Sequence, residues 1–290
     1  HKYKKFLIGE SNSLKEENTS KILKELKESI EIKDLLLLVS IPVVLSLIFL
    51  SPHSFQESMV LNLQNPNLSK FFTTVFVHSN FAHFFNNLLF YVITIIPLYL
   101  MCALSGYKKQ FRYMFLIFVF LFPFLLSEMN INLIEAKTSR GFSGINAAFL
   151  GYLGVATFQY SKESLGIRTK ETDNKILKTF KNVRLKPLIL FLYGSGIVAF
   201  LYAGILSKGS ILILVLITIF LAMSIHFTEG QSLKEASQKK GYFELFLFSI
   251  ILFLMAVSLL FPKQIKGTNI LSHYAGLALG FFSTYLSLSS

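Results

Sequence analysis

The sequence has no tryptophan, only one cysteine and few charged residues. Because Cys102 is the single cysteine among 290 residues, an internal disulfide is excluded and the redox compartment is not indicated by cysteine usage. Charged residues make up 15% of the chain, well below the roughly 25% typical of soluble domains. Hydrophobic residues reach 53%, including 31 phenylalanines, and the mean hydropathy is +0.56. This composition argues against an ordinary soluble domain and is typical of a membrane protein.

Several apolar runs reach the length of about 20 residues that a helix needs to cross a bilayer. We therefore predict an all-α membrane protein, a polytopic helical bundle of about eight spans. The predicted spans cover residues 35–50, 81–104, 111–126, 142–160, 188–206, 210–225, 242–261 and 270–288. The first and the sixth are short for a bilayer, and flanking polar residues would have to extend them.

The net charge of +12 is distributed in a way that indicates membrane topology. The basic residues lie in loops between apolar runs and form no aromatic-interleaved basic domain, so we expect no nucleic-acid partner. With the N-terminus in the cytoplasm, all but 6 of the 28 Lys and Arg residues fall on the cytoplasmic side, as the positive-inside rule requires. An even number of spans returns the C-terminus to that side. We predict a multi-pass integral membrane protein with both termini in the cytoplasm.

The N-terminal segment 1–34 is rich in Lys and Glu. Its first 33 residues lack an apolar core, so we predict no cleavable signal peptide there. Residues 14–34 favour a charged cytoplasmic surface helix or a partly ordered tail. The alternative is an anchor at the membrane surface, because four apolar residues could share one helix face: Ile22, Leu23, Leu26 and Ile30.

Three polar motifs each lie at the start of a long apolar run. They are His78-x4-His83-x3-Asn87, Gly141-Phe142-Ser143-Gly144, and Ser272-His273-Tyr274-Ala275-Gly276-Leu277-x2-Gly280. Polar and ionisable groups inside a membrane segment are costly to bury and usually mark function. Under the predicted topology all three runs begin on the outer side, so the motifs share one depth. The charge count that set this orientation did not use these residues, and the agreement is therefore independent support.

Ser143 is a candidate nucleophile. A serine hydroxyl needs a neighbouring base at neutral pH, and His273 is the best placed histidine. His273 shares a helix face with Gly276 and Gly280, and small residues let two membrane helices approach closely enough for a Ser–His hydrogen bond. The alternative is that these glycines only pack helices and that Ser143 is incidental.

His83 and Asn87 lie one helical turn apart and are expected to project from one face. An imidazole and a carboxamide aimed together are plausible hydrogen-bond donors to a developing oxyanion. The alternative is an ordinary polar contact between helices. A metal site formed by His78, His83 and His273 is a further possibility, but the spacing is not HExxH and no carboxylate lies within these motifs. We expect no metal and no cofactor.

Taken together, the three motifs resemble those of the rhomboid intramembrane serine proteases. That family has H-x4-H-x3-N on its second helix, GxSG at the head of its fourth, and an H-x-A-G-L-x-x-G-like motif on its last core helix. All three occur here in that order. The resemblance implies a rhomboid-like six-helix core within a protease domain of residues 35–290. It also implies a serine endopeptidase that cleaves transmembrane segments of membrane proteins near their outer ends, with the active site opening to the outer side.

The resemblance also implies a role for each motif residue. Ser143 would be the nucleophile and His273 the general base, a dyad without an acid. The oxyanion hole would consist of His83, Asn87 and the backbone amide of Ser143, and His78 would support the outer loop. Four glycines would lie near this site: Gly141, Gly144, Gly276 and Gly280. Expected partners are transmembrane substrates and the lipid bilayer, with no cofactor or metal; the oligomeric state is not indicated.

Two departures from the family pattern affect the prediction. Three predicted spans separate the serine and histidine helices where the family has one, so we predict that residues 188–225 are an inserted helical hairpin. Ala147 stands where the family commonly has an aromatic residue that supports the histidine, so another group, such as Tyr274 or Phe142, would have to orient His273, or the base would be less well held. Two other functions stay open: a catalytically silent rhomboid-like protein that binds membrane clients, and a transporter, which would usually show paired broken helices.

Overall fold

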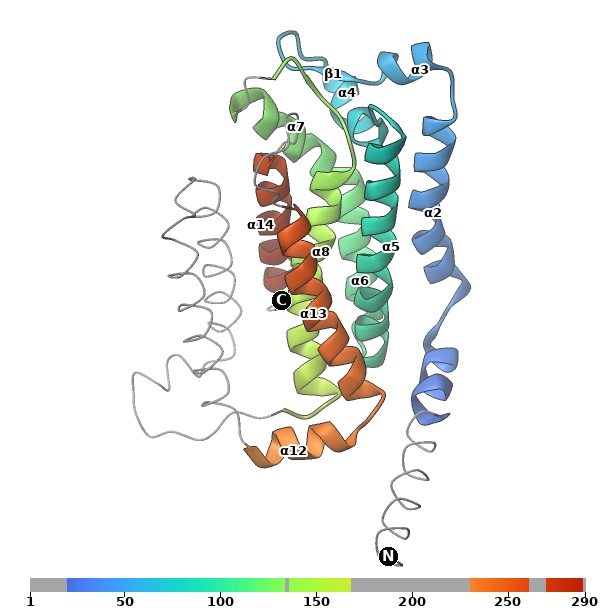
Figure 1. The fold of residues 1–290 in the computed structure, drawn as a ribbon, viewed down its shortest axis with the longest axis vertical. Coiled ribbons are helices and arrows are strands. Elements are labelled where there is room, and N and C mark those ends of the chain that lie inside the picture. The colour runs from blue at the N-terminus through green and yellow to red at the C-terminus, as the bar shows by residue number, and fades with distance from the viewer. Residues whose placement is uncertain (1–19, 134–135, 168–229, 261–269, 289–290) are drawn as a thin grey trace, which may run out of the picture.

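The computed structural model describes residues 20–133, 136–167, 230–260 and 270–288. Apart from one short ribbon, its regular structure within these residues is helical, and the long helices pack side by side (Figure 1). Helix α8 (Ser143–Glu163) lies in the middle and contacts α5 (Phe81–Leu104), α13 (Tyr242–Leu260) and α14 (Ile270–Ser287). The prediction of an all-α helical bundle is confirmed at this level.

The remaining elements complete this bundle. The longer ones are α2 (Ile32–Phe49), α6 (Lys108–Leu116), α7 (Phe122–Leu133) and α12 (Gly230–Gln238). The shorter ones are α3 (His53–Ser58), α4 (Leu68–Thr73), the 3-10 turn η1 (Thr74–Phe76) and the π-helical turn η2 (Ile117–Leu121), which joins α6 to α7. Residues 20–29 are also helical.

Three described helices are long and apolar enough to cross a membrane: Ile32–Phe49, Phe81–Leu104 and the continuous Lys108–Asn132. They match the first three predicted spans, 35–50, 81–104 and 111–126. A shorter apolar segment lies within α13. The predicted spans 188–206 and 210–225, and with them the proposed inserted hairpin, lie outside the described residues.

The third of these candidate helices is longer than the predicted span 111–126, because it continues through polar residues that are buried. Ser127 is 1% exposed and donates to the Phe71 carbonyl oxygen over 2.9 Å. Asn130 is also buried and donates to Ser139 Oγ over 2.9 Å. Polarity at these two positions therefore ended the apolar run in the sequence without ending the helix.

We call the end of the bundle where α5 and α8 begin the upper end, which is uppermost in Figure 1. It carries the antiparallel ribbon of β1 (Leu61–Asn62) and β2 (Thr138–Ser139), with Leu61 paired to Ser139. Thr74 ties this end together: its hydroxyl donates to the Ser139 carbonyl and accepts the Leu61 N–H, and its carbonyl accepts the Gly141 N–H over 3.2 Å. The segment that leads into α8 is thereby held against η1.

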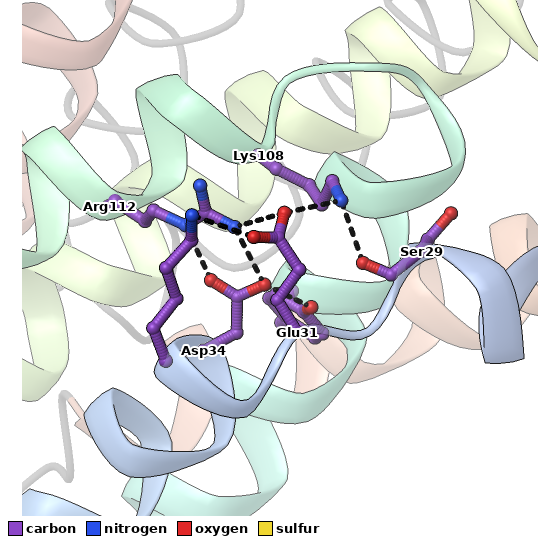
Figure 2. Close-up of polar contacts among 7 residues, drawn as sticks. Ser29, Glu31, Asp34, Lys108 and Arg112 are labelled. Atoms are coloured by element: carbon purple, nitrogen blue, oxygen red, sulfur yellow. Dashed lines mark hydrogen bonds and ion pairs between the residues drawn. The ribbon is translucent and has the colours of Figure 1, made fainter.

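An ion-pair cluster at the opposite, lower end joins the chain around the start of α2 to α6 (Figure 2). Arg112 donates to both carboxylate oxygens of Asp34, over 2.5 and 3.0 Å. Asp34 is fully buried and also accepts the Tyr99 hydroxyl over 2.7 Å. Because charge-assisted bidentate pairs are strong and directional, this cluster fixes where α2 begins against α5 and α6.

Glu31 extends the same cluster toward solvent (Figure 2). It pairs with Arg112 over 2.7 Å and with Lys108 over 3.0 Å. Hydrogen bonds from Lys33, Arg112 and Lys108 hold the pKa of Glu31 well below its ordinary value. Lys108 also donates to the Ser29 carbonyl over 2.7 Å, so the cluster reaches the N-terminal helical segment 20–29.

Segment 20–29 packs on the bundle through part of its apolar face. Ile22 is buried and Leu26 packs against the core, whereas Leu23 and Ile30 are exposed. The four apolar residues that the alternative of a membrane-surface anchor placed on one face are therefore divided: two pack on the bundle and two are exposed. This contact places the segment against the bundle instead of leaving it as a detached tail.

Candidate active site

The first motif is placed by the start of α5. Asn80 caps the helix, because its side chain accepts the His83 N–H over 2.8 Å. The resulting register leaves Asn87 buried, at 5% exposure, while its neighbour Asn86 is exposed. His83 and Asn87 lie one turn apart, as their spacing predicted.

The second motif begins with a turn that requires glycine. Gly141 has φ +110°, which other residues rarely adopt. A Cβ at this position would lie 2.7 Å from Cε1 and 2.8 Å from Nε2 of His83. The His83 ring therefore packs directly against the chain two residues before Ser143. Ser143 follows as the first residue of α8 and is partly exposed.

The third motif packs against the second through glycine. A Cβ on Gly276 would lie 2.0 Å from the Gly144 carbonyl oxygen, and one on Gly280 would lie 2.2 Å from the Ala148 carbonyl oxygen. Neither position has room for any other residue. The predicted close approach of the two helices through small residues is confirmed.

This packing brings His273 to the upper end. His273 is 6% exposed and lies one turn before Gly276 on α14. The carbonyl oxygen of its neighbour Ser272 lies 3.4 Å from where a Cβ on Gly144 would be. Ser143 and His273 thus belong to the same end of one close helix pair. Within the described residues the Ser143 side chain forms no hydrogen bond.

His78 lies next to His83 in the loop before α5. Their ring centroids are 5.0 Å apart and meet edge to face. His78 is 3% exposed, and its Nε2 lies 3.5 Å from the Phe142 backbone nitrogen. Burial, and then the neighbouring His83, lower the pKa of His78 to about 3. A neutral His78 therefore packs between the α5 loop and the start of α8.

A metal site would need ligands beyond this pair. Among the residues that the structure describes, no three His, Cys, Asp or Glu side chains gather closely enough to hold a metal ion. His78 and His83 therefore meet there as a packed pair of rings.

Sequence reasoning missed Asn146, which lies three residues after Ser143 on α8. It is 1% exposed, and its Nδ2 donates to the Asn87 backbone carbonyl over 2.9 Å and to Asn87 Oδ1 over 3.2 Å. The Asn87 amide nitrogen in turn donates to the His83 carbonyl over 2.9 Å. A carboxamide within the apolar run after Ser143 was the signal that could have pointed to it.

Asn130 on α7 is a second residue that the motifs did not include. Its Oδ1 accepts the hydroxyl of Ser272, the residue before His273, over 2.5 Å. Its Nδ2 donates to Ser139 Oγ on β2 over 2.9 Å. Asn130 therefore ties the beginning of α14 to the ribbon that leads into α8.

The two aromatic residues expected to orient His273 lie in different surroundings. Phe142 is fully buried, and its ring packs against Phe76 at 5.9 Å and Tyr91 at 6.2 Å between centroids. Tyr274 is half-buried. Ala147 lies on α8 opposite Gly276, with its Cβ 3.2 Å from where a Gly276 Cβ would be. That spacing leaves α8 and α14 too close for a ring between these two positions.

The upper end thus gathers a partly exposed serine, a buried histidine and a second imidazole–carboxamide pair from α8, α14 and α5. These are the group types of a nucleophilic hydrolase: a nucleophile, a base and hydrogen-bond donors. No protein-family model, curated protein or solved structure matches this chain. What the site does must therefore be inferred from the chain's own residues.

Proposed function

We propose that this chain is an intramembrane serine endopeptidase of the rhomboid type, which cleaves transmembrane segments of membrane proteins. One observation carries the proposal: three motifs far apart in the sequence meet at one end of the bundle. His83 packs against Gly141, which precedes Ser143, and Gly276 packs against Gly144, which follows it. Packing alone explains the glycines but not the histidines and the carboxamide that accompany them.

In this reaction Ser143 Oγ attacks the scissile carbonyl carbon while His273 accepts its proton. His273 then gives that proton to the leaving amine, and a water molecule hydrolyses the acyl-enzyme with His273 acting as base again. His273 is buried at the end of α14 that packs against the start of α8, which is where a base for Ser143 is required.

The negative charge that develops on the substrate oxygen needs donors that are already in place. The Ser143 backbone N–H, Asn87 Nδ2 and His83 Nε2 are the proposed donors. Ser79 Oγ lies 3.3 Å from His83 Nδ1, which leaves Nε2 on the side of Gly141. Asn87 Nδ2 carries two hydrogens and uses one toward the His83 carbonyl, so one remains for a ligand.

The substrates proposed here are single transmembrane helices that reach the site through the bilayer. Apolar side chains on the outer surface of α2 and α5 are compatible with lipid contact; examples are Leu36, Leu47, Phe85 and Ile96. We further propose that both termini are cytoplasmic and that the site opens to the outer side, because of the Lys and Arg distribution.

The rival proposal is a rhomboid-like protein that binds membrane clients without cleaving them. The absence of a hydrogen bond from the Ser143 side chain within the described residues is the observation that favours it. Labelling with a fluorophosphonate probe distinguishes the two proposals, since only an activated serine reacts with it.

The test uses the purified full chain in detergent and in liposomes. Wild type should be labelled by a fluorophosphonate probe and should cleave a model single-span substrate, whereas Ser143→Ala should do neither. Cleavage without labelling, or labelling that survives Ser143→Ala, would overturn the assignment. Client binding with no labelling would favour the silent rival.

A further inference from the structure

Asn146 occupies a position that the three motifs do not cover. It lies on α8 close to one turn after Ser143, and it is 1% exposed. Its side-chain nitrogen contacts both oxygens of Asn87, the backbone carbonyl at 2.9 Å and Oδ1 at 3.2 Å. The Asn146 amide on α8 therefore donates two hydrogen bonds to Asn87, the proposed oxyanion donor on α5.

These contacts determine which way the Asn87 carboxamide faces. A carboxamide has an acceptor oxygen and a donor nitrogen of nearly equal shape, so its surroundings choose the orientation. Asn146 offers a donor to the Asn87 oxygen, and the His83 carbonyl offers an acceptor to the Asn87 nitrogen at 2.9 Å. The nitrogen therefore faces the beginning of α5, where His83 lies against Gly141.

We propose that Asn146 is a positioning residue, which holds the donor end of the Asn87 carboxamide toward the oxyanion hole. This inference rests on the proposed protease function. Without the Asn146 donor, the His83 carbonyl is left as the described contact that orients the Asn87 carboxamide, and rotation that presents the Asn87 oxygen to the site becomes less unfavourable. An acceptor there would repel the substrate oxyanion, and preorganised stabilisation would be lost.

Packing and stability alone do not explain an asparagine at position 146. Within the described residues its Oδ1 is buried without a hydrogen-bond partner, and an unsatisfied buried acceptor lowers stability. Leucine has a similar size and no such atom. A destabilising polar residue next to a site is expected where function requires it, because activity and stability often oppose each other.

The test is Asn146→Leu, assayed with the full chain and a model transmembrane substrate. We expect kcat to fall about 10- to 100-fold, less than for direct loss of an oxyanion donor, with KM nearly unchanged. The thermal midpoint should change little, because the unsatisfied Asn146 oxygen is removed together with the two hydrogen bonds from Asn146 to Asn87. A structural residue would show the opposite, a lower midpoint with kcat retained per folded molecule.

Thr94→Val is the matched control. Thr94 lies on α5, is 1% exposed, and has a buried hydroxyl without a partner among the described residues. Its replacement removes the same kind of atom from the same bundle, two turns below Asn87. Activity should remain that of wild type; a loss as large as that of Asn146→Leu would overturn the proposal.

A double-mutant cycle separates positioning from general damage. In an Asn87→Ala background, Asn146→Leu should cause no further loss of kcat, because the group it positions is absent. An independent loss in that background would overturn the proposal. If both Asn146→Leu and Asn146→Ala fail to fold, the residue is structural and the proposal is also overturned.

Fluorophosphonate labelling of wild type shows whether a negative result contradicts the role of Asn146 or the proposed protease function. Labelled, active wild type with wild-type kcat in Asn146→Leu contradicts only the role of Asn146. Wild type that neither labels nor cleaves contradicts the protease itself, and the positioning role with it.

Discussion

The imidazole ring of His83 packs so closely against Gly141 that no side chain fits between them. A Cβ on Gly141 would lie 2.7 Å from His83 Cε1, and the backbone there has φ +110°. Two separate constraints, contact and conformation, therefore require glycine two residues before Ser143. Through this contact α5 determines how the chain turns into α8.

Gly141→Ala should reduce activity by displacing His83. The added methyl group collides with the ring, so we expect at least a roughly 10-fold loss of kcat/KM per folded molecule, since losing a single oxyanion-hole donor costs more than that. Gly106→Ala is the matched control: Gly106 has φ +82° but nothing within 4 Å of a Cβ. It should lose only about 1–2 kcal/mol of stability from backbone strain. Equal losses of activity in the two variants would show that the His83 contact is unimportant.

Ser143→Ala and His273→Ala should each abolish cleavage of a model transmembrane substrate while the protein still inserts and folds. The Ser143 side chain is partly exposed and makes no hydrogen bond within the described residues, so its hydroxyl contributes little to stability. Circular dichroism and thermal unfolding report folding, and gel analysis reports cleavage. Full proteolysis by either folded variant would contradict the dyad.

Asn87→Ala should impair turnover without eliminating it. Loss of one oxyanion donor costs on the order of 10²–10³ in kcat, and the backbone amide and His83 remain. Asn86→Ala is the control, because Asn86 is exposed where Asn87 is buried. If Asn86→Ala lowers kcat more than Asn87→Ala at equal folded protein, the proposed oxyanion hole is wrong.

The meeting of the three motifs was predictable because spacing and charge carry that information. Small residues at helical spacing after His273 predicted a close approach to the Ser143 helix, and Gly276 lies against Gly144. The i, i+4 spacing of His83 and Asn87 predicted their common face. Both patterns act within single helices, so a linear sequence displays them directly.

The polar contacts between helices were not predictable in the same way. Asn146 and Asn87 are 59 residues apart and meet only because α5 and α8 pack in one particular register. Asp34 sits at the edge of a charged segment, where solvation is the natural expectation, yet Arg112 and Tyr99 accompany it into a fully buried position. Such pairs depend on the rotation of each helix about its axis, which composition does not specify.

Arg112→Met should strongly destabilise the protein. It leaves Asp34 buried without its bidentate partner, and breaking a buried ion pair in this way costs about 3–5 kcal/mol. Arg140→Met is the control, because its partner Glu57 is 42% exposed and a surface pair is worth about 0–1 kcal/mol. Unfolding in mixed detergent micelles measures both free energies. Similar values for the two variants would show that the cluster in Figure 2 does not hold α2 to α6.

His78 should make the free energy of unfolding depend on pH. Burial, and then His83, lower its pKa from the ordinary 6.5 to about 3 in the folded protein. Between these values the unfolded chain binds a proton that the folded protein excludes, so stability rises with pH. Above about pH 6.5 His78 is neutral in both states and does not change the free energy of unfolding with pH. Below that pH it lowers the free energy of unfolding by up to about 1.4 kcal/mol per pH unit, until the pH reaches about 3.

The measurement compares unfolding of wild type and His78→Gln between pH 7.5 and 4.5. His78→Gln removes the buried titrating ring at similar size, so its stability should vary less with pH than that of wild type. Identical pH dependence in wild type and His78→Gln would mean that His78 is protonated or solvated in the folded protein, and the packed pair at the start of α8 would then be wrong.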